Sequence, residues 1–192
     1  SLFFSNSNFV SCSPGGRILD VYGGVTILNC IFSRNSGGLI GGTGNIKIIG
    51  SSFTENAPFD PENSNAWLIA VQYGDSVLIF DSDFSHNVGG TISACMYDNS
   101  TFQIEACTFS NNSNINGSIG GVNQYVCQGA NFIDVRILNS QFTNNEGGYN
   151  AGALRLNPRD APAIISNSSF IQNYGRYGAL YIGGTGIVIE SS

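Results

Sequence analysis

The sequence has little charge, and most of that charge is negative. Only 10% of its 192 residues are charged, against about 25% in a typical globular domain, and Lys47 is the single lysine. The formal net charge is −6 and no basic cluster occurs. We therefore expect no nucleic-acid partner and no attraction to an anionic membrane surface. Solubility must rest on asparagine, serine, threonine and glycine instead.

Long hydrophobic runs and recognisable metal motifs are also missing. No stretch approaches the roughly 18 apolar residues of a membrane span, so we expect none. His86 is the only histidine and the five cysteines have no C-x-x-C spacing, which excludes the usual zinc and redox motifs. The glycine-rich stretches at 41–45 and 183–187 lack the aspartate of the calcium-binding nonapeptide repeat. The sequence therefore predicts neither a metal site nor a cofactor.

What the sequence does have is an internal repeat. ILNCIFSRNSGG at residues 27–38 returns as ILNSQFTNNEGG at residues 137–148. Seven units, 21 to 33 residues apart, are each marked by a phenylalanine: Phe9, Phe32, Phe53, Phe84, Phe109, Phe142 and Phe170. Three residues later stand Asn35, Asn56, Asn87, Asn112, Asn145 and Asn173, with Cys12 in the first unit. Two before the phenylalanine the residue is serine or cysteine, and five before it is isoleucine after the first unit.

Each unit predicts short β-strands separated by turns. Apolar residues two apart, bounded by glycine and asparagine, are typical of strands with one buried face. The position three before the phenylalanine holds Asn, Gly, Asp or Ala, and we place a sharp left-handed bend there. Paired glycines after the phenylalanine mark a second turn in most units. Two or three such strands per unit predict one all-β domain over residues 1–192, a parallel β-helix of about seven coils.

Stacked coils turn each repeated residue into a column. The phenylalanines should form an aromatic stack in the core, with the isoleucine column beside it. The inward asparagines should form a ladder in which each amide hydrogen-bonds to the next, as in other stacked strands. A break in the ladder would leave a buried amide unpaired, which costs about 1 to 3 kcal/mol. Cys12 is expected to end this ladder or to lie in a coil of different geometry.

The alternation of F-x-x-N with a G-G-A-[ILV]-type segment resembles the repeats of a known group of proteins. These are the chlamydial polymorphic outer-membrane proteins and the wider group of right-handed parallel β-helix proteins on bacterial and protist surfaces. The first half is matched by FSRN, FTEN, FSHN, FSNN, FTNN and FIQN, and the second is approximated by GGLI, GGTI, AGAL and YGAL. The resemblance implies a right-handed β-helix and a surface-exposed passenger, adhesin or filament. It transfers no active site, because the matching residues determine the fold.

The catalytic candidates occupy the position two after the phenylalanine. Arg34, Glu55 and His86 come there in successive units, and they would suit a general acid or base with a charge partner. Later units carry only uncharged amides at this position, and an arginine beside a glutamate on adjacent strands is also an ordinary exposed pair. We therefore expect no catalysis. The alternative is a polysaccharide-binding or polysaccharide-cleaving enzyme of the pectin-lyase-like kind.

Extra residues lie between the repeated positions. The segments at 57–67, 113–118 and 157–162 are predicted loops, where insertions on a solenoid often bind ligands. Length drift tolerated at turns explains them equally well. Trp67, Tyr73, Tyr97 and Tyr125 lie in or after the longer segments. Stacking on sugar rings and ordinary packing both fit these aromatic residues.

The cysteines bear on the compartment of the protein. Cys95 and Cys127 lie five and six residues after the glycine pairs of adjacent units, so we predict a disulfide between them. That bond would favour an oxidising compartment. Cys30 and Cys107 occupy the small inward position otherwise held by serine, and we expect them to be buried free thiols.

Four asparagines stand in the N-x-[ST] motif of N-glycosylation. Asn99, Asn111 and Asn116 lie in predicted turns or outward positions and are the candidate sites. Asn167 lies in the bend column and is the weakest of the four. Glycans are therefore among the expected partners.

The whole pattern favours a non-enzymatic extracellular or cell-surface role. Low charge, polar uncharged faces and regular repeats fit a structural or adhesive segment of a surface protein or filament. The sequence carries no polar cap of the kind that solenoids use at their ends. We therefore expect a slice of a longer solenoid or a filament subunit, with adjoining coils or other copies of itself stacked end to end as partners.

Overall fold

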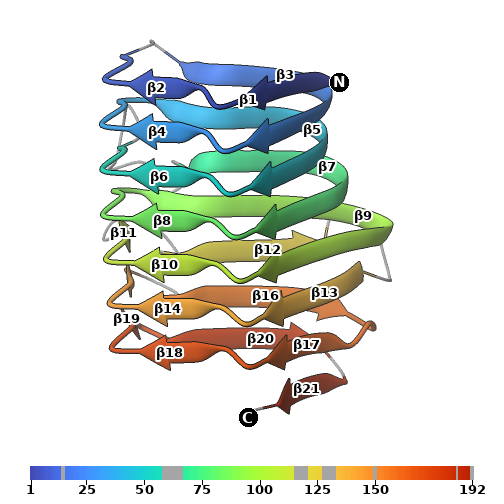
Figure 1. Ribbon diagram of the computed structural model, residues 1–192. Helices are drawn as coiled ribbons and strands as arrows, with labels where there is room; N and C mark the ends of the chain where they lie inside the picture. Colours follow the sequence, from blue (N-terminus) through green and yellow to red (C-terminus); the bar gives the residue numbers. More distant parts are fainter. Residues whose placement is uncertain are drawn as a thin grey trace.

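The chain folds as a stack of β-coils (Figure 1). The computed structural model describes residues 1–13, 16–57, 67–114, 121–126, 133–148, 151–184 and 186–190. Within these ranges every regular element is a strand or an isolated bridge, and each strand pairs in parallel with strands of the neighbouring coils. The prediction of an all-β parallel β-helix is confirmed.

Two parallel sheets run the length of the stack, and a third, shorter one lies beside the later coils. The seven-stranded sheet has one short strand per coil: β2 (Asn8–Val10), β4 (Ile31–Ser33), β6 (Ser52–Thr54), β8 (Asp83–Ser85), β10 (Thr108–Ser110), β14 (Gln141–Thr143) and β18 (Ser169–Ile171). The eleven-stranded sheet contains β1 (Leu2–Ser5), β3 (Arg17–Leu28), β5 (Gly38–Ile49), β7 (Trp67–Phe80), β9 (Gly90–Glu105), β12 (Val122–Val126), β13 (Ile133–Leu138), β16 (Leu154–Arg159), β17 (Ala163–Ser166), β20 (Leu180–Gly184) and β21 (Ile187–Glu190). The third sheet is β11 (Ser113–Asn114), β15 (Glu146–Gly147) and β19 (Tyr174–Gly175).

The strand register follows the sequence repeat. Phe9 pairs with Phe32, and Phe32 with Phe53, so the marker residue of each unit meets that of the next. Ile27 likewise pairs with Ile48. The last strand, β21, continues the series by pairing with β17 one coil back. A residue therefore occupies the same place in the cross-section of every coil.

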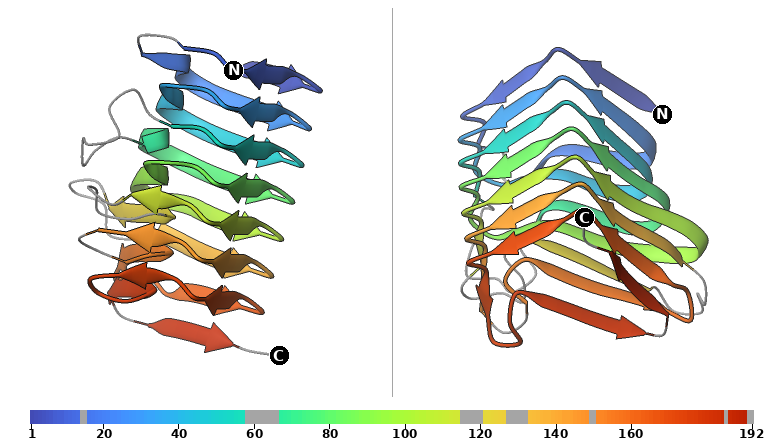
Figure 2. Two further views of the ribbon diagram at one scale, coloured as in Figure 1. Left: turned by 90° about the vertical axis from the view of Figure 1, so that its left-hand side faces the viewer. Right: turned by 60° about the horizontal axis from the view of Figure 1, so that its bottom comes forward.

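The left-handed bend predicted three residues before each phenylalanine is present in the structure. The seven residues of this column all have positive φ, between 48° and 58°: Asn6, Asn29, Gly50, Asp81, Ala106, Asn139 and Asn167. Figure 2 shows the resulting angle between the short strands and the preceding strands in each coil. The backbone N–H at the bend still donates to the next coil, as from Asn29 to the carbonyl oxygen of Ile49 at 2.9 Å. The bend therefore costs no hydrogen bond between coils.

The strands of the first coils are longer than the sequence suggested. β3, β5, β7 and β9 have 12 to 16 residues and continue through the corner where separate strands were expected. At this corner the backbones are too close for side chains. A Cβ at Gly42 would lie 1.8 Å from the carbonyl oxygen of Val21, and a Cβ at Gly44 would lie 1.4 Å from that of Gly23. Glycine thus lets the strand turn without leaving the sheet.

The first half of one predicted loop is a strand. Residues 157–159 belong to β16, which pairs with β20 through a register shift, and only Asp160 forms a turn. Most of the other two predicted loops, residues 58–66 and 115–118, lies outside the described residues. The loop prediction is therefore wrong for residues 157–159, where the strand continues through the register shift, and residues 160–162 are a turn and irregular backbone as expected.

The core is a set of stacked columns. Consecutive phenylalanine rings from Phe9 to Phe170 lie 4.5 to 4.9 Å apart between centroids and within 8° of parallel. From Phe32 to Phe142 the side chains are fully buried. The isoleucine column beside them is buried to the same degree from Ile27 to Ile137. Each stacked aromatic pair adds about 0.5 to 1.5 kcal/mol beyond the burial of its area, so we expect the stack to be the main internal support of the rod.

Candidate functional site

The asparagine column forms a continuous hydrogen-bonded ladder at the corner that follows the phenylalanine stack. The amide Nδ2 of each asparagine from Asn35 to Asn145 donates to Oδ1 of the next one, at 2.9 to 3.0 Å. The same Nδ2 atoms donate to the carbonyl oxygen of the phenylalanine one coil back, as from Asn87 to Phe53 at 2.8 Å. The ladder therefore ties side chains to side chains and to the backbone.

Each amide oxygen in the ladder accepts two hydrogen bonds. Oδ1 of Asn87 accepts from Nδ2 of Asn56 and from the backbone N–H of Asn56, both at 3.0 Å. An inner amide such as Asn87 thus has two donors and two acceptor positions in use, which satisfies a buried carboxamide completely. At the first coil the backbone N–H of Cys12 donates to Oδ1 of Asn35 at 2.9 Å. Cys12 is thereby the ladder's end.

A second ladder runs through the small position two before the phenylalanine. The hydroxyl of Ser51 accepts from the backbone N–H of Cys30, and that of Ser82 accepts from Ser51, both at 3.1 Å. Each hydroxyl also donates to the carbonyl oxygen two residues earlier in its own chain, as from Ser82 to Phe80 at 2.7 Å. The sequence showed only that this position is small, whereas the ladder explains why it is serine rather than alanine.

The two cysteines in this column are buried and free. Cys30 and Cys107 are 1% and 2% exposed, and their Sγ atoms lie 3.4 and 3.2 Å from the carbonyl oxygens of Leu28 and Glu105. Burial raises the pKa of the Cys107 thiol to about 11. A thiol that stays protonated to that pH is a poor nucleophile and metal ligand at neutral pH. These cysteines are packing residues.

The catalytic candidates Arg34, Glu55 and His86 lie in a second left-handed bend. Their φ angles are 52°, 56° and 55°, and the same conformation recurs at this position in every coil, at Ser11, Asn111, Asn144 and Gln172. A strained residue at one site alone would suggest function. Strain repeated in seven coils belongs to the fold.

The surroundings of these three side chains are those of exposed turn residues. All three are exposed, and within the described ranges none of them forms an ion pair. Their backbone N–H groups are used by the stack, as in the bond from His86 to the carbonyl oxygen of Ser110 at 3.0 Å. The structure therefore places the three in one exposed column on the surface.

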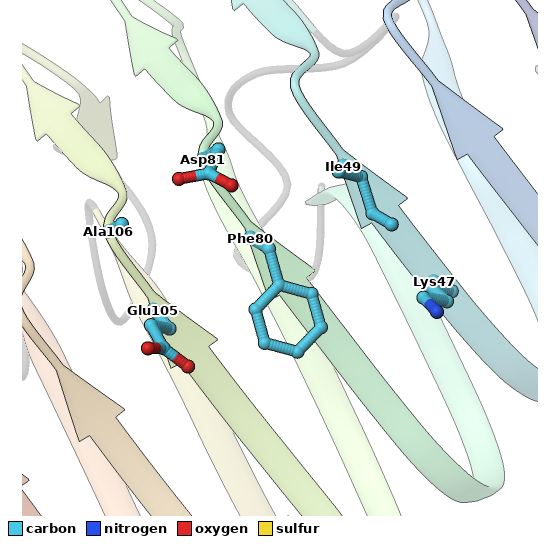
Figure 3. Close-up of a pocket in the computed structure, with 6 residues that line it drawn as sticks. All are labelled: Lys47, Ile49, Phe80, Asp81, Glu105 and Ala106. Carbon is cyan, nitrogen blue, oxygen red and sulfur yellow. The ribbon is translucent and has the colours of Figure 1, made fainter.

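An open depression lies on a different outer surface, beside the first bend column (Figure 3). Its lining residues are Lys47, Ile49, Phe80, Asp81, Glu105 and Ala106. In this view the Phe80 ring lies between Lys47 and Ile49 on one side and the Glu105 carboxylate on the other. Nε2 of Gln103 donates to Glu105 at 2.9 Å. An aromatic ring with carboxylates and an ammonium group at its edges is suited to a sugar ring.

The aromatic residues of the longer segments are used in different ways. The rings of Tyr73 and Tyr97, on adjacent strands, stack with centroids 5.2 Å apart and remain 50% and 44% exposed. Trp67 packs over Gly90 so closely that a Cβ there would lie 2.1 Å from the indole. The side chain of Tyr125 lies outside the described part of the chain. Trp67 is thus an edge-packing residue, and the tyrosine pair is open to solvent.

The structure describes only some of the residues that bear on the compartment of the protein. Cys95 is disulfide-bonded, whereas Cys127, its predicted partner, lies outside the described residues. Asn99 and Asn111 are both exposed, and Asn116 is again outside the described ranges. The chain as described holds no group of three or more His, Cys, Asp or Glu side chains that could bind a metal ion. It also has no helix of the length and apolar character that a membrane crossing needs.

The comparison with known proteins agrees with the architecture. The family model described as the right-handed β-helix region matches residues 1–155, which is most of the chain. No curated protein matches the sequence significantly, so the closer resemblance to chlamydial outer-membrane proteins stays a prediction. The parallel sheets, the coil-by-coil register and this match together show that the chain belongs to the right-handed β-helix family.

Proposed function

We propose that the chain is a non-enzymatic structural or adhesive segment of an extracellular surface protein or filament. The observation that supports this most is how the repeated residues are used. Phenylalanine rings, asparagine amides and serine hydroxyls all bond to their equivalents one coil away. The repeated residues therefore serve to hold the coils together. They form a stiff frame, and the outer positions of the coil can vary.

The charge distribution fits the same role. The outer turn presents Arg34, Glu55 and His86 one per coil at exposed bends, and uncharged amides take their place further along. A catalytic pair would need its groups to converge on one reacting atom, within about 3 Å of it. A polar, weakly charged surface is instead suited to broad contact with a cell wall, a glycan layer or another protein.

The location can be tested in the organism that makes the protein. Antibodies raised against the recombinant chain should label intact cells, and protease added outside those cells should remove the signal. Electron microscopy of the extracted material should then show continuous rods. Labelling that appears only after permeabilisation would reject the extracellular role.

A second candidate function is glycan binding at the depression around Phe80, as in the enzymatic alternative considered from the sequence. The ring, the two carboxylates of Asp81 and Glu105 and Lys47 favour it. A panel of plant, bacterial and animal polysaccharides should be tested for binding and for release of new chain ends. Binding lost in Phe80→Ala without any cleavage would support an adhesin. Cleavage that Glu105→Gln abolishes would support the enzyme and overturn the first proposal.

A further inference from the structure

The corner of β9 holds an exposed asparagine beside an exposed aromatic ring. Asn99 lies in the sequence Tyr-Asp-Asn-Ser-Thr at residues 97–101. It is exposed, and its φ of 59° places it in a left-handed turn. Tyr97, two residues earlier, is 44% exposed and stacks on Tyr73 of the neighbouring coil. Tyr97, Asp98 and Asn99 are all exposed, so the turn brings the asparagine and the tyrosine to the surface within three residues.

The turn is held in place by its neighbours. The buried hydroxyl of Ser100 donates toward the carbonyl oxygens of Tyr97 and of Gly74 in the preceding coil. Thr101 pairs with Ser76 on one side and with Asp134 on the other. The ring of Tyr97 is fixed by its stacking on Tyr73, so little entropy remains for a ligand to remove.

We propose that Asn99 is N-glycosylated and that the first N-acetylglucosamine of the glycan packs on the exposed face of Tyr97. The apolar face of a sugar ring fits an aromatic ring that is already ordered. In the modification, Nδ2 of Asn99 attacks C1 of the first sugar of a lipid-diphosphate-linked oligosaccharide. The C1–N bond forms, the C1–O bond to the diphosphate breaks, and the lipid diphosphate leaves with the bonding electrons. The amide loses one proton to the transferase.

Asn111 is a second exposed site, and the structure distinguishes it from Asn99. It stands in the same N-x-[ST] motif, with serine where Asn99 has threonine, and it too has an aromatic residue two positions earlier. It also lies at positive φ, 54°. Its aromatic residue, however, is Phe109, which is fully buried in the stack. That ring is closed to a sugar on Asn111. Two sites that share the motif and the aromatic residue before it therefore differ in the exposure of that residue.

The modification requires passage through a secretory compartment, and so it rests on the proposed extracellular function. The disulfide at Cys95, four residues before Asn99 on the same strand, is consistent with such a compartment. The test should nevertheless be independent of the natural location. We would add a secretion leader to the chain and express it in eukaryotic cells, which supply the transferase and its lipid-linked donor.

The first variant keeps only the site at Asn99, by Ser113→Ala, Ser118→Ala and Ser169→Ala. The matched control keeps only the site at Asn111 and carries Thr101→Val, Ser118→Ala and Ser169→Ala. Mass spectrometry should find the Asn99 glycan. Trimming to one N-acetylglucosamine should leave the midpoint of thermal unfolding unchanged, and complete removal should lower it by about 2 to 4 °C. The same removal at Asn111 should leave it unchanged.

Tyr97→Ala in the Asn99-only chain should make the midpoint insensitive to deglycosylation. If that variant is not secreted, the parent chain still decides the question, because ring currents should shift the N-acetyl protons of the first sugar upfield and give NOEs to a tyrosine ring. An unmodified Asn99 in the secreted protein would overturn the site. A glycan on Asn99 that neither stabilises the fold nor contacts Tyr97 would overturn the packing of the sugar on the tyrosine ring. Neither result would bear on whether the natural chain is extracellular.

Discussion

The inner and outer columns at one corner of the coil follow different rules, although they are adjacent in sequence. Inward, the corner repeats asparagine, and each amide meets its copy one coil away. Outward, one residue earlier, the column changes freely, including arginine, glutamate and histidine, while φ stays between 52° and 56°. Side-chain contact thus fixes identity inside. Outside, the backbone hydrogen bond to the next coil fixes only the conformation.

The largest expected difference between inside and outside is at the aromatic stack. Phe84→Ala would leave a cavity between Phe53 and Phe109, and substitutions of this kind cost about 3 to 5 kcal/mol. The neighbouring outward change Ser85→Ala should cost less than about 1 kcal/mol, because it removes only the hydroxyl that donates to Asp83. Denaturant unfolding followed by circular dichroism would measure both. Equal losses would show that the stack is not the main support.

The next difference lies in the ladder. Asn87→Leu removes Oδ1, so the backbone N–H and one amide N–H of Asn56 lose their acceptor. Since each orphaned buried group costs about 1 kcal/mol or more, we expect the two to lower the free energy of unfolding by at least about 2 kcal/mol. Val88→Leu, at the exposed neighbouring residue, is the control and should stay within about 0.5 kcal/mol. Unfolding in urea would give the free energy of unfolding of both variants. An unchanged value for Asn87→Leu would show that the ladder does not stabilise the fold.

A pH-dependent difference is expected at Cys107. Its pKa is raised from 9.0 to about 11 by burial, so between these values the unfolded chain loses a proton that the folded chain keeps. Stability is therefore full below about pH 9 and falls as the pH rises to 11, by about 2 to 3 kcal/mol at 1.4 kcal/mol per unit. Unfolding of the native chain and of Cys107→Ser, measured from pH 8 to about pH 11, isolates this group. Parallel curves for the two proteins would contradict the burial effect.

The sequence predicted the inner columns and only part of the outer ones. Repetition revealed the phenylalanines and asparagines because a stacked column demands the same residue in each coil. The first bend was predictable because Asn29, Gly50 and Asp81 belong to types that tolerate positive φ. The second bend could not be predicted, because arginine and glutamate, which occur there, are not residue types that favour positive φ. The stacking of Tyr73 on Tyr97 and the depression at Phe80 depend on register between coils of unequal length, which the repeat alone does not fix.

The smallest expected effect tests whether the two bends are the same backbone device. Ala106, in the first bend, has φ of 54°, and His86, in the second, has φ of 55°. An L-residue in this region costs about 1 to 2 kcal/mol, and glycine removes that strain while adding about 0.4 to 1 kcal/mol of entropy to the unfolded chain. Ala106→Gly and His86→Gly should therefore each stabilise the fold by about 0.5 to 1 kcal/mol. Asn139→Gly is the control and should gain almost nothing, since asparagine already tolerates the bend. Thermal unfolding of the three variants would show the pattern. A gain at Ala106 with a loss at His86 would mean that the outer side chain, and not the backbone alone, holds the second bend.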